Sequence, residues 1–114
     1  MLYRIAERAD WDAARQTGFF ASADLAAEGF IHTSERHQVV ETANRYYRGR
    51  PDVLLLELDE QKLLAAGVAV RHEFVASRQQ AFAHVFGPVP LQAIGRTFAL
   101  VPNAAGQFAL PPEL

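Results

Sequence analysis

A histidine stands at the end of a short apolar run in the segment EGFIHTS, residues 28–34. Two hydroxyl residues, Thr33 and Ser34, follow His32 directly. We expect a short strand ending at His32, with Thr33 or Ser34 capping the helix that comes next. Because helix N-termini attract anions and polar ligand groups, this junction could hold a ligand. The alternative is a structural histidine hydrogen-bonded within a sheet.

Two further residues with acid–base chemistry lie in the second half of the chain. His84, in the segment AFAHVFGPVP, has Phe82 and Phe86 on its own strand face. It is either a core histidine or a ligand contact in an apolar pocket. Glu73 lies within an alternating strand and faces water, unless that face lines a cleft. In a cleft it could act as a general base or stabilise positive charge. Its neighbour His72 points to the opposite face, so we do not expect these two to act as a pair.

The helix expected after Ser34 carries further candidates. Gln38 lies one turn along the helix and points back toward the junction, although a solvated glutamine is the alternative. Asn44 is a weak helix former, which suggests a role for its amide. Tyr46 and Tyr47 lie on the apolar side, where most tyrosines are core residues with the hydroxyl at the rim.

Several kinds of site are disfavoured. The three histidines that could share a metal (His32, His72 and His84) lack an HxH or HxxxH spacing, so we predict no metal site. The sequence has no G-x-S-x-G elbow, no P-loop and no G-x-G-x-x-G motif. It contains no cysteine, which excludes disulfides, thiolate metal sites and cysteine nucleophiles.

Composition indicates an ordinary globular protein. A chain of 114 residues, half of them apolar, predicts a single domain over 1–114. The formal charge is −2 and the basic residues are scattered, so no strong attraction to nucleic acid or to a membrane is expected. Residues 1–20 carry many charges and resemble no signal peptide. The longest apolar run, Val53 to Leu56, is too short to span a bilayer. We therefore expect a cytoplasmic protein whose partner is a small-molecule or nucleotide ligand.

The pattern of elements predicts an α+β domain built on one mixed or antiparallel sheet. The expected strands are Met1–Glu7, Phe30–His32, Val53–Leu58, Val68–Ser77, Phe82–Phe86 and Ile94–Val101. The expected helices begin near Asp10, near Ser22, at Ser34 and after Asp59, mostly in the N-terminal half. The nearly continuous apolar run Val53–Leu58 predicts a central strand that is covered on both faces.

The order of several motifs resembles a bacterial family called domain of unknown function 952. These motifs are WDAARQTGFF, LAAEGFIHTS, QVVETANRYY, LLLELD, RHE and FAHVFGPV. The resemblance runs from about Trp11 to Pro88. Ala83 stands where the family has proline, and Phe86 stands where tyrosine is common.

This resemblance implies a fold similar to that of the ADP-ribosyltransferase superfamily, whose enzymes bind NAD in a cleft between two small sheets. His32 to Ser34 looks like the H-G-(S/T) motif of that superfamily, with Thr33 in place of glycine. Tyr46 or Tyr47 could supply an aromatic wall, and Glu73 the acidic residue. In such enzymes a histidine orients the nicotinamide ribose, and a carboxylate stabilises the oxocarbenium-like transition state.

We therefore predict a small enzyme, or a degenerate relative of one, that binds NAD or a nucleotide-like ligand. The alternatives are a non-catalytic module that binds a small metabolite and a purely structural protein. The predicted catalytic residues are His32, Glu73 and His84, and the predicted ligand-binding residues are Thr33, Ser34, Gln38, Asn44 and Tyr47.

Overall fold

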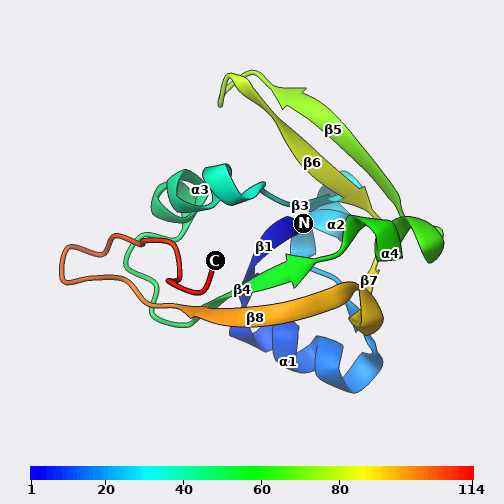
Figure 1. The fold of residues 1–114 in the computed structure, drawn as a ribbon, viewed down its shortest axis with the longest axis horizontal. Helices are drawn as coiled ribbons and strands as arrows, with labels where there is room; N and C mark the ends of the chain where they lie inside the picture. Colours follow the sequence, from blue (N-terminus) through cyan, green and yellow to red (C-terminus); the bar gives the residue numbers. More distant parts are fainter.

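The computed structural model describes residues 1–114 and divides the strands among three antiparallel sheets (Figure 1). The first sheet has the order β1-β4-β8 and consists of Leu2–Glu7, Val53–Leu58 and Ile94–Leu100. The second has the order β3-β6-β5 and consists of Ile31–His32, Gln80–Phe86 and Ala69–Val75. A two-stranded ribbon joins β2 (Phe19–Phe20) to β7 (Val89–Pro90). The α+β class and the antiparallel pairing are confirmed, whereas the prediction of one sheet was wrong.

Four α-helices and two short 3₁₀ helices complete the fold. The α-helices are α1 (Arg8–Thr17), α2 (Ala23–Glu28), α3 (Val39–Tyr46) and α4 (Glu60–Ala65). The 3₁₀ helices are η1 (Arg36–Gln38), which leads into α3, and η2 (Leu91–Ala93), which precedes β8. None of the helices is long and apolar enough to cross a membrane.

Strand β4 is the centre of the core, as its apolar run predicts. All six of its residues are buried, and their side chains alternate between two hydrophobic clusters. Leu54, Leu56 and Leu58 enter one cluster, and Val53 and Leu55 enter the other. The sheet is therefore covered on both faces, and strand β1 along its edge is held in a fixed position.

Helix α1 begins at Arg8, close to the predicted start near Asp10, which lies in its first turn. The predicted helix start at Ser34 was wrong. Ser34 does not cap the helix that follows it, because its backbone pairs with Tyr3 in an isolated bridge. Glu35 is the capping residue and forms a capping box with Gln38. Since the Gln38 N–H at this helix end already bonds to Glu35, that amide is not free for the ligand that the sequence suggested.

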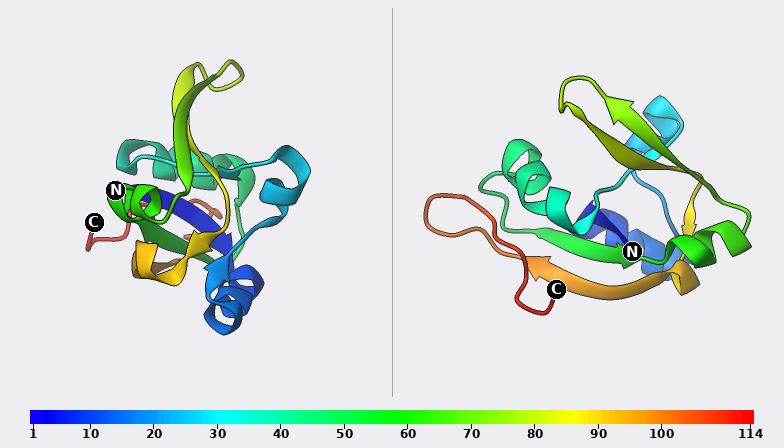
Figure 2. Two further views of the ribbon diagram at one scale, coloured as in Figure 1. Left: turned by 90° about the vertical axis from the view of Figure 1, so that its right-hand side faces the viewer. Right: turned by 45° about the horizontal axis from the view of Figure 1, so that its top comes forward.

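The β5–β6 hairpin stands away from the β1-β4-β8 sheet and approaches α3 at its tip (Figures 1 and 2). Arg78, in the turn of the hairpin, donates to Glu41 Oε1 at 3.1 Å and to Thr42 Oγ1 at 3.0 Å. Its guanidinium carbon also lies 4.6 Å from the centre of the Phe82 ring. The tip of the hairpin is therefore fixed to α3.

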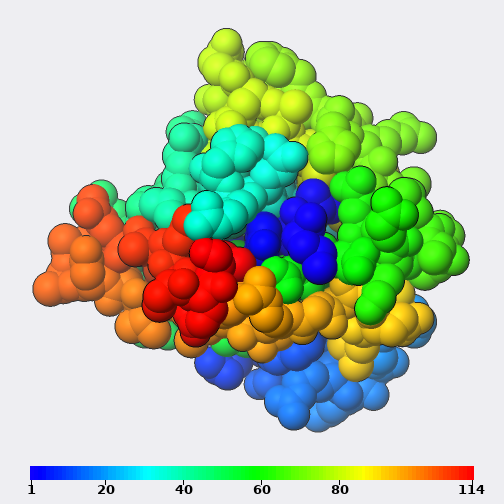
Figure 3. Space-filling model, in the orientation of Figure 1, coloured from blue at the N-terminus to red at the C-terminus, as the bar shows by residue number.

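The residues after β8 fold back and pack beside η1 and α3 (Figure 3). Asn44 accepts a hydrogen bond from the Phe108 backbone N–H at 2.7 Å, and Arg36 donates to the Leu114 backbone oxygen at 3.0 Å. This tail ties α3 to the end of the chain.

Candidate functional site

A cleft of about 750 Å³ lies between strand β1 of the first sheet and the β5–β6 hairpin of the second. Helix α3 closes one side with Thr42, Tyr46 and Tyr47, and the segment from α2 to β3 closes the other. Cavities of this size hold small-molecule ligands and cofactors. Of the residues predicted for the site, His32, Thr33, Ser34, Tyr47 and His84 line the cleft.

His84 lies at the base of the hairpin and is only 5% exposed. Its Nδ1 donates to Glu73 Oε1 at 2.8 Å, and its ring stacks on Phe30 with the ring centres 4.1 Å apart. A carboxylate only accepts hydrogen bonds, so Nδ1 carries a proton, and whenever the ring is neutral Nε2 keeps its lone pair. Nε2 is buried and has no hydrogen-bond partner. The arrangement leaves a basic nitrogen without a partner beside the cleft.

Glu73 reaches His84 because the alternation predicted for this strand is correct. Arg71 is the cross-strand partner of His84, and Glu73 lies on the same face, one step further along β5. His72 projects from the other face, where its Nε2 lies 3.4 Å from Glu60 Oε1. The structure therefore pairs Glu73 with His84, a contact that the sequence did not reveal.

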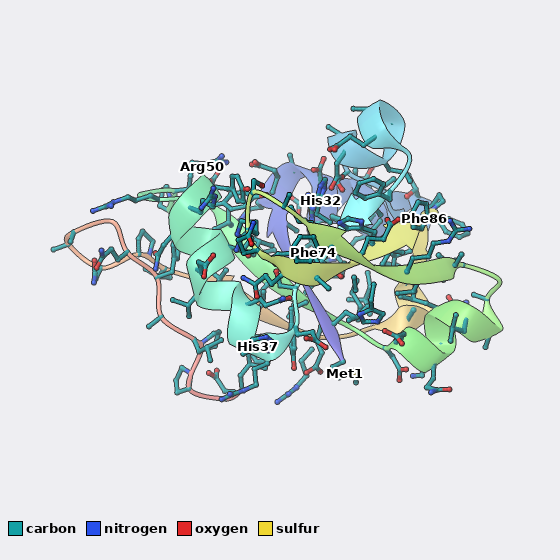
Figure 4. The ribbon with its side chains drawn as sticks, turned by 90° about the horizontal axis from the view of Figure 1, so that it is seen from above. Met1, His32, His37, Arg50, Phe74 and Phe86 are labelled. Carbon is teal, nitrogen blue, oxygen red and sulfur yellow. The ribbon has the colours of Figure 1, made fainter.

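His32 stands directly opposite His84, because the two are register partners in the β3–β6 pair. The ring centres are 5.4 Å apart, and the rings meet edge to face. His32 is more open, with 47% of its side chain exposed. Figure 4 shows it between the hairpin and the helix α2. Two imidazoles thus lie together at one end of the cleft.

Asp24 in α2 organises the surroundings of His32. Its Oδ2 accepts from His32 Nδ1 at 2.8 Å, from the His32 backbone N–H at 2.9 Å and from Arg4 at 2.9 Å. The Ser22 hydroxyl donates to its other oxygen. Burial alone would raise the pKa of Asp24, but the hydrogen bonds from His32 and the charge of Arg4 outweigh burial and hold that pKa well below its usual value. Asp24 is therefore ionised and fixes His32 through Nδ1.

The three arginines that line the cleft differ in how fully they are paired. Arg50 binds both Glu7 and Asp52, and Arg78 binds Glu41 and Thr42. Arg4 donates through one terminal nitrogen to Asp24 and to the His32 backbone oxygen. Its Nε is buried and has no partner.

The backbone groups of Thr33 and Ser34 are already in use. The Thr33 N–H donates to the Ala83 oxygen at 3.2 Å, and the Thr33 hydroxyl donates to the same oxygen at 2.7 Å. The Ser34 N–H donates to the Tyr3 oxygen at 2.8 Å. A ligand beside Thr33 and Ser34 therefore finds no free backbone N–H at either residue.

Two predicted ligand-binding residues lie outside the lining of the cleft. Asn44 holds the C-terminal tail through Phe108. Gln38 is buried, accepts from the Glu35 N–H at 3.0 Å and donates to the Ala81 oxygen at 2.8 Å. Gln38 thereby joins the start of α3 to strand β6.

Replacing Gln38 with alanine should lower the free energy of unfolding by about 2 kcal/mol, since a buried donor and a buried acceptor lose their partner. Urea titration measures this change. His37→Ala is the matched control, because this exposed neighbour should change stability by less than about 0.5 kcal/mol. Weaker ligand binding by Gln38→Ala at unchanged stability would instead assign this side chain to the ligand site.

Sequence reasoning missed Arg4, Asp24 and Arg78. Asp24 precedes His32 by eight residues, which corresponds to no known spacing rule, and only the turn at Gly29 brings the two together. Arg4 looks like an ordinary polar position in an alternating strand. No group of three or more His, Cys, Asp or Glu side chains is placed to hold a metal ion.

Comparison with known proteins gives a family and a close structural relative. The model of the family described as protein of unknown function (DUF952) matches residues 5–97. The crystal structure of protein CC0527 from Caulobacter crescentus is 34% identical, with a TM-score of 0.84 over 96% of this chain and 93% of that one. The solution NMR structure of CC0527 is 35% identical, with a TM-score of 0.76 over 99% and 95% of the two chains. No curated protein matches the sequence.

Proposed function

Because the chain belongs to the DUF952 family, whose description gives no activity, we propose a function from the cleft: cleavage at ribose C1′ of NAD or a similar nucleotide. The family resemblance noted in the sequence is confirmed, and the relation to ADP-ribosyltransferases is part of this proposal. The observation that carries it is the buried His84, held by Glu73, with a partnerless Nε2 beside a second carboxylate-bound histidine.

His84 has the properties of a general base. The hydrogen bond from Nδ1 to Glu73 fixes both the tautomer and the orientation of the ring, as a carboxylate does for the histidine of a catalytic triad. Stacking on Phe30 holds the buried ring in place, and Nε2, which has no hydrogen-bond partner in the protein, is the atom that the proposal assigns to the reactant. Glu73 then acts as a positioning residue, a different role from the direct stabilisation of positive charge expected from the sequence.

The atoms and electrons of the proposed step balance as follows. An oxygen of water or of an acceptor hydroxyl attacks C1′ of the nicotinamide ribose, and its proton passes to His84 Nε2. The bond between C1′ and the pyridinium nitrogen breaks, and its electron pair leaves with neutral nicotinamide. In this proposal His32, which Asp24 fixes through Nδ1, binds the ribose hydroxyls. ADP-ribose, or its adduct with the acceptor, remains.

Two features of the cleft support a nucleotide ligand. It lies between two three-stranded sheets, the location that the resemblance implies for NAD. Tyr46 and Tyr47 line it, and tyrosine rings can pack against a base. Since the Thr33 N–H is bonded to Ala83, other groups must hold the carboxamide.

Thermal melting with NAD, ADP-ribose, nucleoside phosphates and simple metabolites tests the proposal, together with an assay of nicotinamide release. A ligand at 100 times its Kd should add about 2.7 kcal/mol to the stability of the folded state. We expect a shift with NAD that His32→Ala abolishes and that His72→Ala, on the opposite strand face, preserves. A shift without nicotinamide release would favour a non-catalytic binding module. No shift from any nucleotide would contradict the proposal.

A further inference from the structure

Two buried side-chain nitrogens in this chain have no hydrogen-bond partner, Arg4 Nε and His84 Nε2. Both residues line the same cleft. Buried polar atoms are nearly always satisfied, so an orphan atom in a native site calls for an explanation. The proposed reaction gives one for His84 and leaves Arg4 unexplained.

Arg4 is built into the cleft wall. It lies on β1, is 9% exposed, and is anchored at 2.9 Å by Asp24 and at 3.0 Å by the His32 backbone oxygen. These contacts use one terminal nitrogen and fix the guanidinium in place. The Nε–H is a donor that cannot be deprotonated, and it lacks an acceptor. An acceptor supplied by a ligand would complete its hydrogen bonding.

The Tyr47 hydroxyl is a second donor in the lining of the cleft, and the charges of Arg4 and Asp24 act on it. Tyr47 lines the cleft, and its hydroxyl forms no hydrogen bond in the structure. Burial raises the pKa of this phenol, and the nearby charge of Arg4 opposes the change only in part. The hydroxyl therefore keeps its proton at neutral pH and can donate it.

We propose that Arg4 Nε and the Tyr47 hydroxyl form an oxyanion subsite that receives a phosphate or carboxylate group of the ligand. This inference rests on the cleft of the proposed function and not on the chemistry at C1′. Arg50 and Arg78 are less suited to the role, because their Nε atoms already donate to Asp52 and Glu41, whereas the Nε of Arg4 has no partner. Four acidic residues also line the cleft and repel anions that are held by charge alone: Glu7, Asp10, Asp24 and Glu28. The oxyanion must therefore be held by hydrogen bonds from specific donors.

NMR titration of the full ¹⁵N-labelled chain tests the subsite directly. Inorganic phosphate and acetate are the probes, at constant ionic strength, and the signal is the Nε–Hε resonance of Arg4. A saturable shift of this resonance is expected. A tighter response to phosphate points to a nucleotide ligand, and a tighter response to acetate points to a carboxylate metabolite. A resonance that neither anion moves overturns the proposal.

Variants separate a built subsite from general attraction of charge. Arg4→Gln should weaken binding of the better probe at least tenfold, whereas Arg50→Gln, which removes the same charge from the same cleft, should weaken it less than twofold. Equal losses in the two variants overturn the proposal. Tyr47→Phe, which retains the ring, should weaken binding about threefold or more and serves if Arg4→Gln does not fold.

The two proposals fail in different ways. Anion binding without nicotinamide release from NAD keeps the subsite and removes the transferase-like reaction. Nicotinamide release with an unmoved Arg4 resonance removes the subsite and keeps the reaction.

Discussion

Replacing His84 with glutamine should lower the rate of nicotinamide release from NAD by a factor of about 100 to 10,000, the usual range for loss of a general base. Glutamine occupies a similar volume and can still bond to Glu73, so the fold and the ligand affinity should change little. Only the lone pair of Nε2 is lost. Single-turnover measurements, with Kd taken separately from binding, distinguish the chemical step from association.

Two control variants test whether the loss of rate is specific to His84. His72→Gln changes the same residue type on the opposite face of the hairpin and should keep the wild-type rate. Glu73→Gln should lower the rate less than His84→Gln does, because the amide oxygen can still accept the hydrogen bond from Nδ1 that orients the ring. A fully active His84→Gln variant would remove the proposed mechanism.

Replacing Asp24 with alanine should cost about 3–5 kcal/mol of stability at pH 7, because the buried charge of Arg4 then loses its carboxylate partner. The side chain of Asp24 is 13% exposed, so solvent screens this pair only weakly. Urea unfolding measures the change. Asp12→Ala, which removes an exposed carboxylate from α1, should leave stability within about 0.5 kcal/mol of wild type.

The pH dependence of this difference has a defined sign. The folded-state pKa of Asp24 lies below its ordinary value of 3.8, so the unfolded state binds the proton more readily. The contribution of Asp24 is complete above that ordinary value and is lost as pH falls through the folded-state pKa. The gap between wild type and Asp24→Ala should therefore be constant from pH 7 to about pH 5 and shrink below about pH 4. A gap that widens on acidification would contradict this account.

Local sequence patterns correctly predicted the strands and helices that depend only on residues close in sequence. The apolar run of β4 and the alternation of β5 each gave a strand within two residues of its observed ends, and Asp59 caps α4 as expected. The helix start after Ser34 was wrong because a backbone bridge to Tyr3 uses Ser34, and that bridge spans 31 residues of sequence.

The site could be predicted only in part, because its residues are brought together by contacts between segments far apart in the sequence. His32 and His84 were identified separately, but their proximity depends on the pairing of β3 with β6, across 52 residues. The partners of these histidines were harder to assign. Asp24 comes from a different helix, and Glu73 reaches His84 only because of the register between β5 and β6. One sequence without an alignment contains no signal for such long-range pairing.

The two three-stranded sheets differ in how much they contribute to the hydrophobic core, and this affects which substitutions the protein can tolerate. Residues 71–82, which include the tip of the hairpin, contribute no member to either hydrophobic cluster, although Val75, Ser77 and Arg78 line the cleft. Substitutions or insertions in this turn therefore reshape the cleft at small cost to the core. Under the proposed function, the length and composition of this one turn would tune ligand preference while the β1-β4-β8 sheet stays unchanged.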